Sequence, residues 1–268
     1  MTASATLPHR RDTLEAYERT IERVVQHMKE HLDQPLDLDE IARIAATSKF
    51  HFVRVFDEVT GTTPHHFLAS LRVQRAKELL LATDSSISDI CLQVGYNSLG
   101  TFSKTFSTLV GLSPQEFRGL PRRLTPLQFG KAIWHFLASG QKVSGRRLTG
   151  VVEGSARLRG FTFVGAFTGG VPQGVPFSGT VLLKPGEFCI QRPDLAEFHL
   201  LAAFIPLSAD LTTIVTTLPV GWVASYRVQA SDELSAPPRL RLRPLRTTDP
   251  PIVLALPALP PWRRTFAR

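Results

Sequence analysis

The chain has 268 residues, 43% of them hydrophobic, with two cysteines and a formal net charge of +8. This length suits two domains of ordinary size, and no apolar run approaches the roughly 20 residues that a membrane-spanning helix needs. Met1–Glu15 lacks the apolar segment of a signal peptide, and the cysteines lie far apart without metal-ligand spacing. We therefore expect a cytoplasmic protein without disulfide bonds.

The positive charge is unevenly distributed along the chain. Residues 1–126 hold 15 Lys or Arg and 15 Asp or Glu, whereas residues 127–268 hold 16 and 8. A basic surface attracts nucleic acid, but the N-terminal half is neutral overall. Net charge therefore does not mark that half as a DNA binder, and only the placement of its cations can do so.

Helical periodicity covers residues 12–122, after residues 1–11, which we expect to be flexible. Apolar residues recur on one face of a first helix that ends near Leu32. The capping pairs Asp12–Glu15 and Asp37–Glu40 predict the starts of the first two helices. The further helices are expected at Leu38–Ala45, after Ser48, at Pro64–Leu81, at Ile87–Val94, after Ser98 and after Ser113.

An internal repeat with an offset of 50 residues organises this half. Ser48–Phe67 (SKFHFVRVFDEVTGTTPHHF) aligns without a gap with Ser98–Phe117 (SLGTFSKTFSTLVGLSPQEF). In each copy the serine can cap a helix, two phenylalanines four residues apart anchor one face, and a glycine suits a left-handed helix end. A short helix and a tight turn precede each copy, which is the helix-turn-helix arrangement. The sequence therefore predicts two such units, joined by the long helix Pro64–Leu81.

Two segments of this half carry a family resemblance: LDLDEIARIAATSKFHFVRVFDEVTGTTPHHFLASLRVQRAKELL and SISDICLQVGYNSLGTFSKTFSTLVGLSPQEFR. Over roughly residues 14–120 the chain resembles the AraC/XylS regulators. The resemblance implies a bacterial transcription regulator that binds double-stranded DNA sequence-specifically, with RNA polymerase as a candidate partner. It also implies that the other domain senses a small molecule or mediates association.

The second helix of each unit is expected to enter the major groove, with its N-terminal residues at base edges. Cations there can donate to guanine, and apolar side chains can touch thymine methyls. Because few of the side chains form base-specific hydrogen bonds, we also expect shape readout and phosphate contacts. The expected base contacts, which the resemblance also indicates, are Lys49, Phe50, Val53, Arg54, Leu99, Gly100, Ser103 and Lys104. The expected phosphate contacts are Ser48, Arg72 and Ser98.

Four of these residues have a structural alternative. Phe50 can be partly buried, and Arg72 can pin the long helix to its neighbours instead of binding phosphate. Arg54 can pair with Asp57 or Glu58 on the protein surface, and Lys104 can likewise be a surface cation that does not contact DNA. Both acidic residues stand where the family often carries lysine, which weakens the attraction for phosphate.

The composition and the pattern of apolar residues change after a linker at residues 123–145. From Arg146 onward, glycine and proline are frequent and apolar residues come in short bursts, which predicts strands separated by turns. The segments GFTFVGAFTGGVPQGVPFSGTVLLKPGEFCIQ and EFHLLAAFIPLSAD resemble a transthyretin-like or carboxypeptidase-regulatory-like β-sandwich. The fold class is therefore multidomain: an all-α double helix-turn-helix domain followed by an all-β sandwich-like domain at residues 146–268. The expected strands are Leu158–Phe167, Thr180–Leu183, Phe188–Ile190, Phe198–Ile205, Trp222–Val228 and Ile252–Leu256.

Ligand contacts in the β domain are assigned to Trp222 and Tyr226, with His199 and Phe177 as further candidates. The alternative is that the aromatic residues fill a core and His199 lies on an exposed face. The run Arg239–Arg246 alternates arginine with leucine, so as a strand it has one basic and one apolar face. The basic face either supports DNA binding electrostatically or is a solvated edge that resists strand pairing.

The leading hypothesis is a ligand-modulated, sequence-specific transcription regulator. The alternative is a DNA-bound scaffold whose β domain recruits a protein partner without a small-molecule effector. An apolar pocket of several hundred Å³ would favour the first, and a flat exposed apolar patch the second. The C-terminal half has no nucleophile elbow, metal-ligand spacing or phosphate loop, so we expect neither an enzyme nor a metal or cofactor. No heptad repeat marks a dimerisation helix, which favours a monomer.

Overall fold

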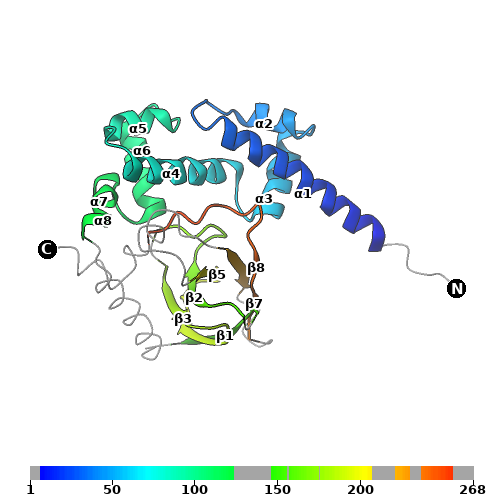
Figure 1. The fold of residues 1–268 in the computed structure, drawn as a ribbon. Helices are drawn as coiled ribbons and strands as arrows, with labels where there is room; N and C mark the ends of the chain where they lie inside the picture. The colour runs from blue at the N-terminus through cyan, green and yellow to red at the C-terminus, as the bar shows by residue number, and fades with distance from the viewer. Residues whose placement is uncertain are drawn as a thin grey trace.

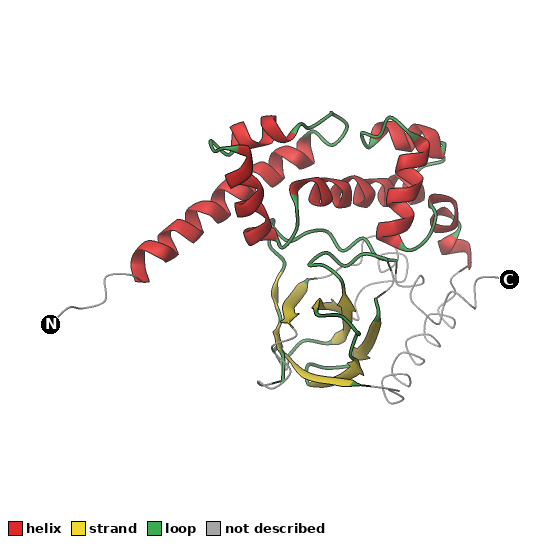
Figure 2. Cartoon of the chain, turned by 180° about the vertical axis from the view of Figure 1, so that it is seen from behind, coloured by secondary structure: helices red, strands yellow, loops and turns green. Residues whose placement is uncertain are grey.

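The computed structural model places a helical region on one side of a β region (Figure 1). It describes residues 7–123, 146–155, 157–174, 176–206, 221–229 and 237–255. Seen from behind, the helices form one layer and the strands lie together below it (Figure 2). The predicted linker lies outside the described residues except for Arg123. Within the described residues, no helix is both long and apolar enough to cross a membrane.

The helical region follows the predicted order of elements. The helices Leu38–Ala45, Pro64–Leu81 and Ile87–Val94 are confirmed to within one residue. Two predictions at the N-terminal end are wrong: the first helix starts before Asp12, and Asp37 makes no side-chain cap bond although it occupies the cap position of its helix. The helices are α1 (Leu7–Glu30), α2 (Leu38–Ile44), α3 (Lys49–Thr60), α4 (Pro64–Ala82), α5 (Ile87–Gln93), α6 (Leu99–Val110), α7 (Pro114–Arg118) and α8 (Leu120–Arg123).

The β region contains two sheets. One has three strands in the order β4-β1-β7, and the other has five in the order β3-β2-β5-β6-β8. All strand pairs are antiparallel except β1 with β7, which run parallel. The strands are β1 (Arg147–Glu153), β2 (Gly160–Phe167), β3 (Ser178–Leu182), β4 (Glu187–Gln191), β5 (Glu197–Pro206), β6 (Trp222–Gln229), β7 (Arg239–Arg241) and β8 (Arg243–Pro244).

The strand predictions are confirmed for β2 to β6, with boundaries shifted by up to two residues. Strand β1 was not predicted. The predicted strand Ile252–Leu256 is wrong over its described residues, which form no strand. Instead, the backbone N–H of Ala255 donates to the carbonyl oxygen of Val110 at the end of α6, with an N···O distance of 3.0 Å. This extended segment therefore bonds to a helix end.

The five-stranded sheet is apolar on both faces. On β5, Phe198 and Leu200 belong to a core shared with the three-stranded sheet, whereas Ala203 and Ile205 belong to a core shared with the helices. Side chains alternate between the faces of a strand, so a strand buried on both sides is apolar throughout. The five-stranded sheet is thus the middle layer between the helical region and the three-stranded sheet.

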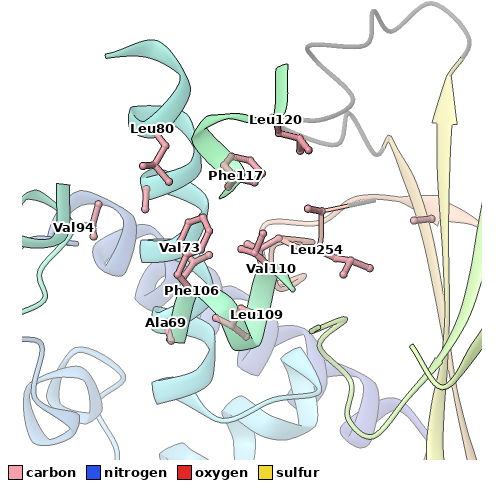
Figure 3. Packing of buried hydrophobic residues seen from close by; sticks show 14 of the residues in the cluster. Ala69, Val73, Leu80, Val94, Phe106, Leu109, Val110, Phe117, Leu120 and Leu254 are labelled. Carbon is pink, nitrogen blue, oxygen red and sulfur yellow. The ribbon is translucent and has the colours of Figure 1, made fainter. Parts of the chain in front are cut away.

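The helical region is divided between two cores. The first is built from α1 to α4 and includes Phe52, Phe56 and Phe67. The second joins α4 to α7 with the five-stranded sheet and the segment Ile252–Ala255. Figure 3 shows this second core, with Phe106, Leu109 and Val110 of α6 near Leu254.

The arginine-leucine alternation at the C-terminal end is confirmed over Arg239–Leu242. Leu240 and Leu242 are buried, and Arg239 and Arg241 are exposed on an edge strand, where both contact the Glu153 carboxylate at 2.8 and 3.3 Å. The pattern ends there, because the side chain of Leu245 is 48% exposed.

Candidate nucleic-acid interface

The two repeat copies form α3 and α6 with the predicted local interactions. The hydroxyl of Ser48 accepts the backbone N–H of His51, and that of Ser98 accepts the N–H of Thr101. Both helices end at a glycine in the left-handed region, Gly61 with φ +73° and Gly111 with φ +85°. Each helix is therefore capped at both ends by the residue types that the repeat preserves.

Buried phenylalanines fix which face of each helix is free. Phe52 and Phe56 of α3 and Phe102 and Phe106 of α6 are all 0% exposed, and within each helix the two rings lie 5.5 and 5.8 Å apart, respectively. The side chains on the opposite face of each helix point away from the core and are free to contact a partner.

Most of the predicted base-contacting residues are exposed at the N-terminal half of α3 or α6. Lys49, Phe50, Arg54, Leu99, Gly100 and Lys104 are exposed, whereas Val53 and Ser103 are half-buried. The alternative that Phe50 is partly buried is wrong, because its side chain is 90% exposed. A large apolar side chain in water costs free energy unless a partner covers it.

The two cations on α3 each lie close to another polar side chain, and for Arg54 this is neither of the expected partners, Asp57 and Glu58. The Nζ atom of Lys49 lies 3.1 Å from the carboxylate of Asp39 in α2. The guanidinium of Arg54 lies 3.2 Å from Nδ1 of His51, one turn earlier on the same helix. Exposed pairs of this kind contribute little stability, so both cations can exchange these neighbours for DNA.

Arg72 lies where the two helix-turn-helix units meet. Its Nε donates to the carbonyl oxygen of Leu32 at 2.9 Å, and its Nη2 donates to that of Gln34 at 2.8 Å. The guanidinium also stands over the Tyr96 ring, 5.5 Å from its centroid, and burial lowers its pKa. These bonds favour the pinning interpretation of Arg72. The other two predicted phosphate contacts, Ser48 and Ser98, are exposed.

Sequence reasoning missed two exposed residues at the same end of α6. Asn97 precedes the cap and Thr101 lies in the first turn. An asparagine side chain can form two hydrogen bonds with adenine, at N6 and N7. A threonine can form a hydrogen bond through its hydroxyl group or contact a thymine methyl through its own methyl group. Their position within one residue of the cap or in the first turn of a reading helix was the signal that could have identified them.

The opposite ends of α3 and α6 face the β region. The backbone N–H of Gly174, in the loop after β2, donates to the carbonyl oxygen of Leu109 at 3.0 Å. In the same loop, Gly170 lies so close to the end of α3 that an added Cβ would stand 2.5 Å from the carbonyl oxygen of Gly61. A helix of 12 residues is about 18 Å long, so the N-terminal turns of both helices stand clear of the sheets (Figure 1).

The predicted ligand residues of the β region lie apart from one another. Trp222 packs against the core between the sheets, and Tyr226 and Phe177 are exposed. His199 lines a cavity between the five-stranded sheet and the end of α3, and neither Trp222 nor Tyr226 is among the residues that line it.

Comparison with known proteins places the recognisable family in the helical region. Residues 41–119 match the model of a family described as a helix-turn-helix domain. The MmsAB operon regulatory protein of Pseudomonas aeruginosa is 38% identical over 92 residues, which cover 34% of this chain and 30% of that protein. An uncharacterized HTH-type transcriptional regulator of Bacillus subtilis, YbfP, is 28% identical over 109 residues, or 41% of this chain and 37% of that protein.

Solved structures match a similar share of this chain. The DNA-binding domain of AdpA, in complex with a target DNA, is 30% identical with a TM-score of 0.36, covering 37% of this chain and 89% of that one. A transcriptional regulator from Chromobacterium violaceum, titled as having an AraC-type DNA-binding domain, is 31% identical with a TM-score of 0.37, covering 40% and 95%.

The chain spans about a third of the length of the two curated relatives. It contains a helix-turn-helix domain, and those relatives are named as regulators, in agreement with the expectation that the chain is not an enzyme. The family match ends at residue 119, so the transthyretin-like resemblance of the β region stays a prediction.

Proposed function

We propose that this protein is a sequence-specific DNA-binding transcription regulator, in which α3 and α6 read two adjacent segments of the major groove. One observation carries the proposal. The two copies of the repeat, Ser48–Phe67 and Ser98–Phe117, fold into two equivalent capped helices. The N-terminal turns of these helices are exposed on the side away from the sheets. A single chain then carries two reading helices and recognises an asymmetric site, with centres about 34 Å apart as in paired helix-turn-helix units.

The base contacts fall to the exposed residues of these turns. Arg54 and Lys104 occupy the same repeat position and donate to guanine O6 and N7. Phe50 and Leu99 contact thymine methyls, and Lys49, Val53, Gly100 and Ser103 lie beside them. Ser48 and Ser98 donate their hydroxyl hydrogens to phosphate while their oxygens cap the helices, and the helix N-termini add positive potential.

A small molecule at the β region is the proposed regulator of DNA binding. The cavity beside α3 has a volume of about 280 Å³ and is lined mainly by apolar side chains. A hollow of this size and composition favours a small-molecule effector over the alternative of a protein-binding scaffold, which calls for a flat apolar patch.

Selection of DNA from a random-duplex pool with the full-length protein tests the proposal. We expect an asymmetric motif of two blocks about one helical turn apart. Binding is then measured for Arg54→Ala and Lys104→Ala at two salt concentrations. Each variant is expected to lose about 1–3 kcal/mol of binding free energy and the definition of its own block.

Arg75→Ala is the matched control for the loss of a cation. Arg75 is exposed on α4 and pairs with Glu78 at 2.8 Å, outside both reading helices. This variant should keep both blocks. Recovery of no motif, with weak and steeply salt-dependent binding, would mean that the full-length protein does not read sequence, and would contradict the proposal.

A further inference from the structure

An apolar hollow lies between the two regions of the molecule. One wall is the last turn of α3, from Glu58 to Gly61, and the floor is the helix-facing side of β2, β5 and β6. Its volume is about 280 Å³, roughly twice that of an engineered protein cavity that binds benzene. Its apolar lining includes the side chains of Val59, Phe163, Leu201, Ala203, Val223 and Ile252.

Both arginines at the rim are paired with a carboxylate. Arg227 forms two hydrogen bonds of 2.8 Å with the Glu197 carboxylate, and Arg243 forms two of 2.6 and 2.7 Å with that of Asp249. Glu58 also lines the cavity and adds a negative charge. An anionic ligand would have to displace a carboxylate and approach Glu58, and any ion would lose its hydration against the mainly apolar lining. The site therefore selects against charged molecules, and against anions most strongly.

His199 is one of the polar residues that line the cavity, together with Thr60 and Ser225. Its ring lines the cavity, and its Nε2 lies 4.0 Å from the Glu197 carboxylate, too far for a hydrogen bond. Burial, followed by the positive charge of Arg227, lowers the pKa of His199. The imidazole is thus neutral at pH 7 and offers one donor and one acceptor nitrogen.

We propose that this cavity binds an uncharged, largely apolar small molecule of one to three rings, with a hydroxyl, carbonyl or N–H group that bonds to His199. The end of α3 forms one wall, so the bound molecule holds the first reading helix in a fixed position relative to the sheet. As a regulatory site, the cavity rests on the proposed DNA-binding function. The binding of the ligand itself does not.

The two reading helices are attached to the β region differently, so a ligand in the cavity acts on α3 and not on α6. The end of α6 receives backbone hydrogen bonds from Gly174 and Ala255 and shares an apolar core with the sheet. The core of the first unit contains no described residue of the β region, and the cavity lies between them. A molecule in the cavity therefore fixes the position of α3 relative to the sheet, to which α6 is already bonded.

The test uses N-phenyl-1-naphthylamine, an uncharged three-ring amine whose fluorescence rises in apolar surroundings, with the full-length protein. We expect saturable binding of one molecule per chain. Its sulfonated relative, 1-anilinonaphthalene-8-sulfonate, should bind at least tenfold more weakly. Bound probe should also slow amide hydrogen exchange in residues 58–61. No saturable binding, or equal binding of the anionic relative, would overturn the proposal.

Two variants fill the cavity from opposite walls. Ala203→Leu adds volume from the sheet and Val59→Phe adds it from α3, so that one remains informative if the other fails to fold. Each should weaken probe binding at least tenfold. Ala196→Leu, at an exposed position just before β5, is the matched control and should bind the probe as the parent protein does. Unchanged binding in both folded cavity variants would place the probe elsewhere and refute the site.

The regulatory part has its own readout. In protein that reads a selected DNA motif, the probe should change affinity at least threefold, and the change should disappear in Ala203→Leu. Probe binding without any effect on DNA affinity would refute the regulatory role. Failure to recover a DNA motif would count against the proposed function, whereas the probe titration requires no DNA and would still decide the ligand site.

Discussion

The two helix-turn-helix units differ in what surrounds them, although their sequences repeat. Both reading helices have a serine cap, a pair of buried phenylalanines and a left-handed glycine at the end. The core of the first unit is closed within α1 to α4, whereas that of the second continues into the five-stranded sheet. Local sequence thus determines each unit, and the tertiary partner determines how firmly each is held.

Helix α4 transmits this difference because it contributes to both cores. Leu68 and Leu71 pack in the first core, and Val73, Ala76 and Leu80 pack in the second. The second unit, α4 and the sheet form one continuously packed body, which should open cooperatively. The first unit should open at a lower cost.

Substitution of equivalent phenylalanines should have the largest effect and should separate the two units. Phe56→Ala and Phe106→Ala each remove a fully buried ring and should each lower the free energy of unfolding by about 3–5 kcal/mol. Because Phe106 contacts a core shared with the sheet, its loss should accelerate hydrogen exchange in β2 and β5 as well as in α6. Loss of Phe56 should accelerate exchange in α1 to α3 and leave β2 and β5 protected.

Hydrogen exchange followed by mass spectrometry measures both outcomes in the full chain. Identical exchange patterns for the two variants would show that the molecule opens as a single unit. The comparison between the two cores would then be wrong, even if both variants are destabilised equally.

Lys77 weakens the second unit in a manner that depends on pH. Its side chain is 0% exposed, and its Nζ has no hydrogen-bond partner within the described residues and lies 5.5 Å from the Phe117 ring. Burial lowers the pKa of Lys77 from 10.5 to about 7. Between these values the unfolded chain binds a proton that the folded chain does not, so the free energy of unfolding should rise from pH 7 toward pH 10.

Lys77→Met should remove this pH dependence and raise stability near pH 7 by about 1–4 kcal/mol, since it replaces a buried cation with an apolar side chain of similar length. Urea unfolding at pH 7, 8 and 9 provides the measurement, and Lys104→Met, at an exposed position, controls for loss of a positive charge. A steeper rise with pH in Lys77→Met than in the parent protein would contradict the assignment.

The repeat made the helical half predictable, because caps, helix ends and buried faces are encoded within a few residues of one another. The serines, phenylalanines and glycines of each copy specify α3 and α6 without any knowledge of the rest of the molecule. The same face assignment placed Phe50 outward, but it left partial burial open until the structure showed Phe50 to be 90% exposed. The bonds of Arg72 to Leu32 and Gln34 did not, because they join residues about 40 positions apart.

The β region was less predictable because its contacts are non-local. Ile252–Ala255 has the composition of a strand, yet Ala255 bonds to the end of α6. The cavity could not be predicted either, since it requires the end of α3 to meet the helix-facing side of the five-stranded sheet. One signal was present: β2 and β5 are apolar at nearly every position, which indicates a sheet covered on both sides.

The loop after β2 offers a sharper test of how the first unit is held. An added Cβ at Gly170 would lie 2.5 Å from the carbonyl oxygen of Gly61, whereas one at the neighbouring Gly169 meets nothing within 4 Å. Gly170→Ala should therefore push the loop away from α3 and cost about 1–3 kcal/mol. Gly169→Ala is the matched control and should be close to neutral. Faster exchange at residues 58–61 in Gly170→Ala alone would support the contact, and equal exchange in both variants would exclude it.

The smallest effect is expected at an ion pair between α1 and the β region. Arg246 lies 3.2 Å from Glu18, and both side chains are about half exposed. Exposed pairs contribute about 0–1 kcal/mol, so a double-mutant cycle of Arg246→Ala and Glu18→Ala should give a coupling energy in this range that falls as salt rises. A larger coupling that persists in high salt would mean that α1 is firmly attached to the β region. The first unit would then be anchored as well as the second, and the cavity would have less freedom to move α3.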